Sequence, residues 1–306
     1  MPGLNRVIRL WPRLLLSTLF VTFASFAGAH PGNGIVVLPD GSVITGDAVG
    51  SNVWRFRSGA APELVISNFH CHWVTLGRDG NVYAETQSND SGTWQTTIHK
   101  IDLKTKKAHP VLKGPQSLSV FLVDKDSSIL ALVDGVLQRF AGGKSSPYKG
   151  NGRPSADDQT YLDGDLAMAW GLNGEILLLC GNRLWTTGVD GSMKIKASFI
   201  GTAYGLYAAP GNRIKPWGVT VDGAGRPIVT DPSTEQVFRI EKDGKWSTLD
   251  WTKHEWAALG VAVSQGRIYL VESKTIGNRN LGPRVAVLDK DGKKWVLGTV
   301  GPQGDS

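Results

Sequence analysis

The stretch WGVTVDGAGRPIVTDP, residues 217–232, contains two short apolar runs on either side of a turn sequence. Alternating apolar runs that are separated by a few residues rich in Gly and Asp are typical of a β-hairpin. The stretch therefore predicts two antiparallel strands with a turn near Gly225.

The same pattern occurs six times along the chain, in windows that begin at Gly34, His72, Leu118, Leu166, Trp217 and Leu259. The turns are expected near Gly41, Gly80, Ser127, Gly174, Gly225 and Gly266, which are 39, 47, 47, 51 and 41 residues apart. A regular spacing of this kind indicates a repeated supersecondary unit.

Each hairpin is followed by a third strand candidate, such as NVWRFR or EQVFRIEKDG, and often by a fourth, such as PELVIS or KWSTLDW. The chain also contains 38 glycines and 11 tryptophans, with no sustained helical period. Four antiparallel strands every forty to fifty residues are the period of a β-propeller blade. We therefore predict an all-β, six-bladed β-propeller of four-stranded antiparallel blades. A two-domain sandwich is the alternative, but it does not explain six equivalent turns.

The segment KPWGVTVDGAGRPIVTDPSTEQVFRI (Lys215 to Ile240) resembles an NHL repeat, and ALGVAVSQGRIYLVES fits the same pattern with a turn one residue shorter. The chain is thus similar to the six-bladed group that includes NHL proteins, gluconolactonase-type lactonases, strictosidine-synthase-like proteins and the peptidyl-hydroxyglycine amidating lyase. These proteins differ in chemistry, so the resemblance implies the fold and leaves the activity open.

The chain departs from the enzymes of this group at their metal ligands. Gluconolactonase-type proteins hold calcium with a Glu in a first-blade motif, whereas the first blade here reads HPGNGIVVLPDG and has no Glu. The amidating lyase holds zinc with three channel histidines, and His70 or His72 together with His254 match that set loosely.

The N-terminus reads as a secretory leader. Arg6, Arg9 and Arg13 precede the apolar run LLLSTLFVTFASF, which is followed by the small residues AGA at 27–29. This run is too short for a membrane span, and the small residues suit signal peptidase. We expect a signal peptide over residues 1–29 and a single propeller domain over residues 30–306, secreted or periplasmic, with no membrane span after cleavage.

Charge argues against nucleic acid as a partner. Cleavage after Ala29 removes three arginines and no acid, so the net charge falls from +6 to +3. No basic cluster or basic helix concentrates this mild charge.

The chain has two cysteines, Cys71 and Cys180, which are too few for a disulfide framework. Cys180 ends the apolar run EILLLC. Because a buried cysteine behaves as a small hydrophobe, we expect both thiols to be free and buried.

In a propeller the innermost strands run along a central channel, and the residues that precede them gather at one end, the channel mouth. The segment NFHCHW, residues 68–73, lies at this position in the second repeat. Residues two apart in a strand face the same way, so His70 and His72 are expected to point together while Cys71 points away. We predict that any divalent metal, zinc or calcium, binds at His70 and His72 with His254 or His30 as a third ligand. The alternative is that these histidines only hydrogen-bond a neighbouring blade.

Other candidates for ligand contacts lie at the same mouth. Trp73, Trp217 and Trp256 precede inner strands and are candidate aromatic walls, and Glu85, Asp231 and Glu272 begin loops that open on the same side. The alternative for the acids is structural, because Asp at strand ends commonly caps turns.

Two functions remain open. The first, which we prefer, is an exported monomeric binding module for a small molecule, peptide or protein at the mouth, since it requires only the fold and an aromatic-rich opening. The second is a metal-assisted hydrolase or lyase that uses the histidines, which requires three converging ligands and a base. The sequence establishes no cofactor.

Overall fold

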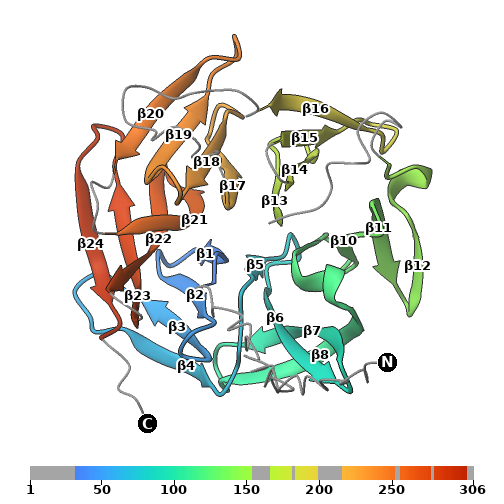
Figure 1. Cartoon of the computed structure of the whole chain (residues 1–306), viewed down its shortest axis with the longest axis horizontal. Coiled ribbons are helices and arrows are strands. Elements are labelled where there is room, and N and C mark those ends of the chain that lie inside the picture. The colour runs from blue at the N-terminus through green and yellow to red at the C-terminus, as the bar shows by residue number, and fades with distance from the viewer. Residues whose placement is uncertain are drawn as a thin grey trace, which may run out of the picture.

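The computed structural model describes residues 32–153, 166–180, 183–198, 216–251, 256–276 and 279–301. Within them, 24 strands form six four-stranded antiparallel sheets, and each sheet is made of strands that are consecutive in the sequence. Figure 1 shows the six sheets arranged as blades around a central axis. The prediction of a six-bladed β-propeller is confirmed.

The blades follow the chain in order. Blade 1 contains β1 (Ile35–Val37), β2 (Val43–Asp47), β3 (Asn52–Phe56) and β4 (Glu63–Ser67). Blade 2 contains β5 (Val74–Leu76), β6 (Val82–Asp90), β7 (Thr93–Asp102) and β8 (Lys107–Pro115). Blade 3 contains β9 (Phe121–Val123), β10 (Ile129–Val133), β11 (Val136–Ala141) and β12 (Lys144–Pro147), with the short 3₁₀ turns η1 (Gln116–Ser119) and η2 (Tyr148–Gly150) beside it.

The second half repeats this order. Blade 4 contains β13 (Leu166–Trp170), β14 (Ile176–Cys180), β15 (Arg183–Thr187) and β16 (Met193–Ser198). Blade 5 contains β17 (Gly218–Val221), β18 (Pro227–Asp231), β19 (Gln236–Ile240) and β20 (Trp246–Trp251). Blade 6 contains β21 (Ala257–Ser264), β22 (Arg267–Ile276), β23 (Arg279–Leu288) and β24 (Lys294–Thr299).

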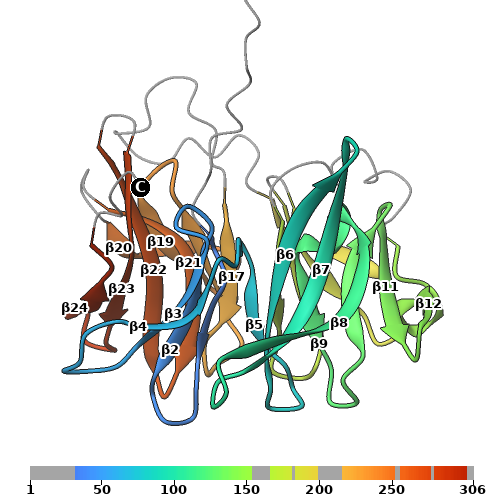
Figure 2. The ribbon, with the colours of Figure 1, turned by 90° about the horizontal axis from the view of Figure 1, so that it is seen from below.

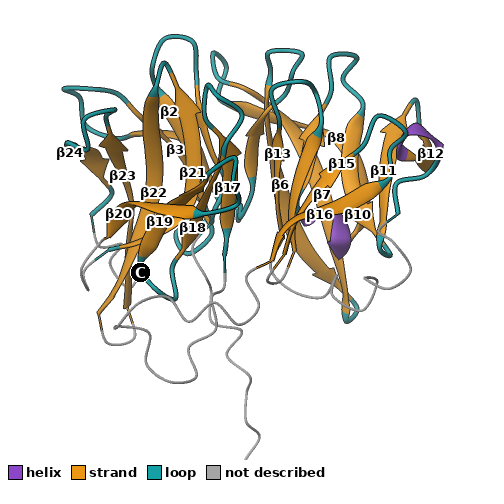
Figure 3. Cartoon of the chain, turned by 90° about the horizontal axis from the view of Figure 1, so that it is seen from above, coloured by secondary structure: helices purple, strands orange, loops and turns teal. Residues whose placement is uncertain are grey.

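The turn between the first two strands of each blade lies where the sequence predicts it. All six predicted turn residues have positive φ angles, from 62° at Ser127 to 82° at Gly80. This left-handed conformation is open to glycine without steric cost, which explains why five of the six positions are glycine. The turns project from one side of the ring, opposite the mouth (Figures 2 and 3). We call this side the turn face.

The two faces of each blade pack against different neighbours, as period-two alternation requires. In blade 5, Val219 and Val221 join the cluster that extends through blades 2 to 4, whereas Ile228 packs with the residues of blade 6. Thr230 also faces blade 6 and donates a hydrogen bond of 2.9 Å to the carbonyl of Leu259. Further apolar clusters fill the interfaces between blades 1 and 2 and between blades 6 and 1. The hydrophobic core therefore lies between neighbouring blades around the ring.

Around the channel the inner strands approach so closely that several contacts admit only glycine. A methyl group on Gly34 would lie 2.0 Å from the amide nitrogen of Val74, and one on Gly260 would lie 1.9 Å from the carbonyl oxygen of Asn33. A methyl group on Gly218 would lie 2.9 Å from Cα of Gly260. The blade 6–1 contact closes the ring, and in the part of the chain that the structure describes each blade is built from four consecutive strands, with none exchanged between blades.

Both cysteines are free and fully buried, as predicted. The predicted leader, residues 1–29, and His30 lie outside the described residues. The helical segments that are described include none with the length and apolar character needed to cross a membrane.

Gly260 offers a test of the ring closure. We expect Gly260→Ala to lower the free energy of unfolding by about 1–3 kcal/mol, since the new methyl group must displace the backbone of blade 1. Gly223→Ala is the matched control, because Gly223 has no atom within 4 Å of the added methyl group. For the control, urea denaturation should show that the free energy of unfolding changes by less than about 0.5 kcal/mol. Equal stability of the two variants would contradict the closure described here.

Candidate functional site at the channel mouth

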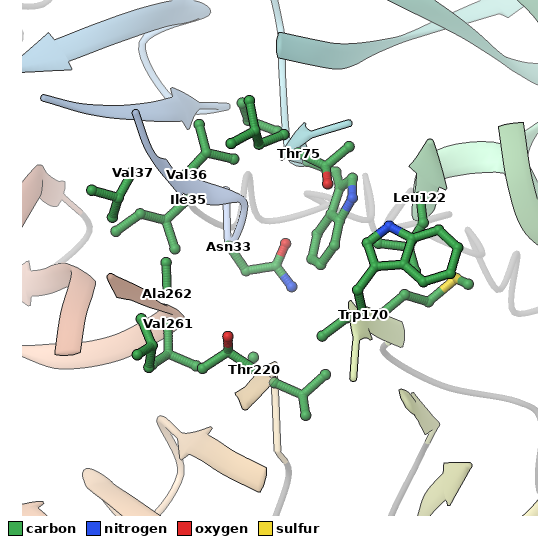
Figure 4. Close-up of a pocket in the computed structure, with 18 residues that line it drawn as sticks. Asn33, Ile35, Val36, Val37, Thr75, Leu122, Trp170, Thr220, Val261 and Ala262 are labelled. Carbon is green, nitrogen blue, oxygen red and sulfur yellow. The ribbon is translucent and has the colours of Figure 1, made fainter. Parts of the chain in front are cut away.

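The axial channel is narrow, and none of the described residues that line it is ionisable. Its volume is about 190 Å³, and all six inner strands contribute to its lining. The polar side chains that reach it include Asn33, Thr75 and Thr220, set among Val, Ile, Leu and Trp (Figure 4). Because small-molecule sites usually measure about 300–1,000 Å³, the channel itself is small for an organic ligand. The mouth of the channel is therefore the candidate site.

His70 and His72 lie at the mouth, immediately before β5. Their ring centroids are 4.5 Å apart with an interplanar angle of 82°, so the two imidazoles meet edge to face. The expectation that the rings gather is confirmed. The strand itself begins only at Val74, so the turn of the connecting segment places the rings together rather than a strand pleat.

The backbone of His72 is held from two sides. Its N–H donates a 2.6 Å hydrogen bond to Oε1 of Glu85. Its carbonyl accepts hydrogen bonds from the N–H groups of Asn33 and Gly34, at 2.9 and 3.0 Å. His72 is therefore fixed at the seam between blades 1 and 2.

Glu85 is the buried centre of this arrangement. It lies on β6 and its side chain has no exposed surface. Oε1 also accepts a 3.2 Å hydrogen bond from the N–H of Trp73 and lies 3.4 Å from Nδ1 of His72. Oε2 is buried and has no hydrogen-bond partner among the described residues. A carboxylate held by backbone N–H groups is stabilised in its charged form, and the imidazole of His72 lies within 3.4 Å of it.

Cys71 faces away from the two histidines, as predicted. Its thiol contacts the carbonyl of Trp73 at 3.3 Å and lies against Gly46 of blade 1. Burial raises the pKa of the Cys71 thiol well above its ordinary value, and the nearby Glu85 carboxylate adds to this effect.

His99 belongs to the same neighbourhood and was not predicted. It lies on β7 opposite Ala84, with Nε2 2.9 Å from the hydroxyl of Thr86 and its ring edge-to-face with Phe69. Burial lowers the pKa of His99, and Glu85 partly opposes this shift. Only the register of the β6–β7 pair places this histidine near Glu85.

The three predicted tryptophans are held in packing contacts. Trp73 is buried, and its indole N–H donates to the carbonyl of Phe121 in blade 3 at 2.9 Å. Trp217 is partly buried, and its carbonyl accepts a 2.9 Å hydrogen bond from the side chain of Asn33. The guanidinium of Arg284 lies 4.1 Å above the ring of Trp256.

Asp231 and Glu272 also make structural contacts. Asp231 is buried and accepts hydrogen bonds from the N–H and hydroxyl of Ser233, which matches the turn-capping alternative. Glu272 is buried and forms ion pairs with Arg284 at 2.5 Å and Lys294 at 2.7 Å. Of the predicted acids, Glu85 is thus the one placed beside the histidine pair.

A metal site is not assembled within the described part of the chain, where no group of three or more His, Cys, Asp and Glu side chains is arranged to hold an ion. His254, the predicted third ligand, lies outside the described residues.

The sequence matches no family model and no curated protein. Solved structures with a similar fold include a catalytically inactive virginiamycin B lyase from Staphylococcus aureus with quinupristin, at 12% identity over 88% of this chain and 85% of that one, with a TM-score of 0.53. A gluconolactonase from Xanthomonas campestris is similar at 13% identity, with 82% of this chain and 86% of that chain covered and a TM-score of 0.55. A PQQ-bound aldose sugar dehydrogenase from Streptomyces coelicolor is similar at 14% identity, with 82% of this chain and 90% of that chain covered and a TM-score of 0.54. At these identities the likeness shows the fold alone.

Thiol reactivity tests the placement of Cys71. Since both thiols are buried and the pKa of Cys71 is raised, we expect neither to react with a disulfide reagent in the native protein at pH 8. Both thiols should react once the protein is unfolded in denaturant. A thiol that reacts within seconds in the folded protein would place a cysteine at the surface of the mouth.

Proposed function

We propose that the mature chain is an exported, monomeric β-propeller that binds a small molecule or a peptide at its channel mouth, with His70 and His72 as the polar contacts. One observation carries this proposal. The backbone of His72 is fixed because its N–H donates a hydrogen bond to Glu85 and its carbonyl accepts hydrogen bonds from blade 1, and its ring lies against that of His70. Side chains fixed before a ligand arrives lose little entropy on binding.

The burial of Glu85 supports a built site. Enclosing a carboxylate costs free energy unless hydrogen bonds compensate, and here they come from the two residues that begin the inner strand. We infer that Glu85 is a positioning residue that holds the His72 imidazole at the mouth.

The two imidazoles of His70 and His72 also indicate which hydrogen-bonding groups a ligand must carry. Neutral imidazole has one donor and one acceptor nitrogen, so the two rings suit a ligand with both kinds of group, such as an amide. The channel below is so narrow that it accepts at most a slender substituent.

A metal-assisted hydrolase or lyase is the second candidate. The contact of 3.4 Å between Glu85 and Nδ1 of His72 favours it, because a carboxylate that orients an imidazole is the arrangement of a general base. A lyase and a gluconolactonase are among the proteins of similar fold. In this candidate His70, His72 and His254 would hold zinc or calcium, which would polarise the substrate.

The binding proposal is tested with a fragment library and ligand-detected NMR on the mature protein. We expect fragments to bind, and their signals to be lost in the double variant His70→Ala, His72→Ala. Lys242→Ala is the control, since it removes an exposed side chain from the β19–β20 turn of blade 5, far from the mouth. If every bound fragment survives the loss of both mouth histidines, the proposal is wrong.

Metal analysis separates the two candidates. The enzyme candidate requires about one zinc or calcium ion per chain, lost in His72→Ala together with any lactone hydrolysis or elimination activity. Metal-free protein that still binds fragments through the two histidines retains the first candidate and removes the second.

N-terminal sequencing of the exported product should begin at His30, and an intact leader would contradict export.

A further inference from the structure

The axial channel beneath the mouth contains hydrogen-bonding groups that no described part of the chain satisfies. Its volume of about 190 Å³ corresponds to about six water molecules. Polar side chains enter it from three blades, Asn33 from blade 1, Thr75 from blade 2 and Thr220 from blade 5 (Figure 4). Because polar groups in a protein interior normally have hydrogen-bond partners, these three groups indicate what the channel accepts.

The side-chain amide of Asn33 presents a fixed acceptor. Its Nδ2 donates a 2.9 Å hydrogen bond to the carbonyl of Trp217. This bond holds the amide nitrogen on the side of blade 5, so Oδ1 points away from blade 5 and into the channel (Figure 4). The backbone of Asn33 is held as well, since its N–H donates to the carbonyl of His72 at 2.9 Å. Oδ1 accepts no hydrogen bond from another described residue.

Thr75 and Thr220 place two hydroxyls at one level of the channel. Each lies two residues before the residue whose N–H closes the turn of its blade, Gly77 in blade 2 and Asp222 in blade 5. Blades 2 and 5 are opposite each other in a ring of six, and the two side chains lie on opposite sides of the cavity (Figure 4). Neither hydroxyl has a hydrogen-bond partner among the described residues, whereas the buried hydroxyl of Thr230 donates to a backbone carbonyl of blade 6 at 2.9 Å.

The remaining walls determine which charge a bound group can carry. They are formed by aliphatic side chains and by the indoles of Trp73 and Trp170, and the described lining residues include no ionisable one. Enclosing a charged group without an oppositely charged partner costs much free energy, whereas an uncharged polar group needs only hydrogen bonds. The channel therefore favours an uncharged group.

A primary carboxamide matches the three polar groups of the channel in number and type. Its two N–H donors suit Oδ1 of Asn33 and one threonine hydroxyl, and its carbonyl accepts a hydrogen bond from the other hydroxyl. A carboxylate has no donor for Oδ1 of Asn33, and an ammonium group has no acceptor for a hydroxyl. Each of these two also carries a charge that the lining leaves unpaired.

We propose that the axial channel binds a slender primary carboxamide group, with Oδ1 of Asn33 and the hydroxyls of Thr75 and Thr220 as its hydrogen-bond partners. The carboxamide would belong to a ligand whose other end meets His70 and His72, so this inference rests on the function proposed for the mouth.

Propionamide, propionate and propylammonium, which are slender probes of different charge, test the proposal without a mouth ligand. We expect propionamide to shift the indole N–H resonance of Trp170 saturably in ¹H–¹⁵N NMR spectra of the mature protein. Trp170→Phe assigns this resonance. Propionate and propylammonium should bind about ten-fold more weakly, because the channel offers their charge no partner.

The double variant Thr75→Val, Thr220→Val preserves the shape of both side chains and removes both hydroxyls. We expect it to weaken propionamide binding about ten-fold, and each single variant about three-fold, since each hydrogen bond contributes modestly. The single variants keep the test open if the double variant does not fold. Thr248→Val, Thr299→Val is the matched control, because these exposed threonines lie on the outer strands β20 and β24. The control should change binding less than about two-fold.

Propionamide binding that the loss of the threonine hydroxyls leaves unchanged would overturn the proposal. Equal binding of the three probes, or no saturable shift at Trp170, would do the same. The variant His70→Ala, His72→Ala separates the channel from the mouth and should leave the shift at Trp170 in place. If that variant abolishes the shift, propionamide occupies the mouth and the channel proposal fails. If no fragment depends on the two histidines while propionamide still shifts Trp170, the mouth function fails and the channel pocket stands.

Discussion

The fold depends on how closely the inner strands approach one another around the channel. At Gly34, Gly218 and Gly260 the backbone of one blade touches that of another, with no room for even a methyl group. These contacts lie at the seams between blades 1 and 2, 5 and 6, and 6 and 1, where the apolar faces of the neighbouring blades also meet. Among the described strands none is shared between blade 6 and blade 1, so the contact of Gly260 with Asn33 and the packing around it close the ring there.

The same close approach builds the mouth. Gly34 can reach the carbonyl of His72 only because it has no side chain, and that hydrogen bond fixes His72 from the side of blade 1. Glu85 fixes it from within blade 2. The candidate site is thus a consequence of the blade 1–2 seam.

The six blades and their turns could be predicted because they depend on local chemistry. Alternating apolar residues define the strands, and a left-handed turn selects glycine at five positions and tolerates Ser127 at the sixth. The pairing of His70 with His72 was also predictable, since the two residues are neighbours in sequence. The contact of Glu85 with His72 and the nearness of His99 were not, because they require the register of β5, β6 and β7. Asp231 and Glu272 have the sequence positions of site residues, yet one caps a turn and the other is paired with Arg284 and Lys294.

The central claim is that buried Glu85 fixes the backbone of His72 and Trp73 at the mouth. Hydrogen exchange of these two amides, followed by NMR, tests it most directly. The account expects both amides to exchange only through global unfolding in the wild-type protein, and to lose that protection in Glu85→Ala while the amides of blade 5 keep theirs. Exchange of His72 and Trp73 at the rate of an exposed loop in the wild-type protein would contradict the account.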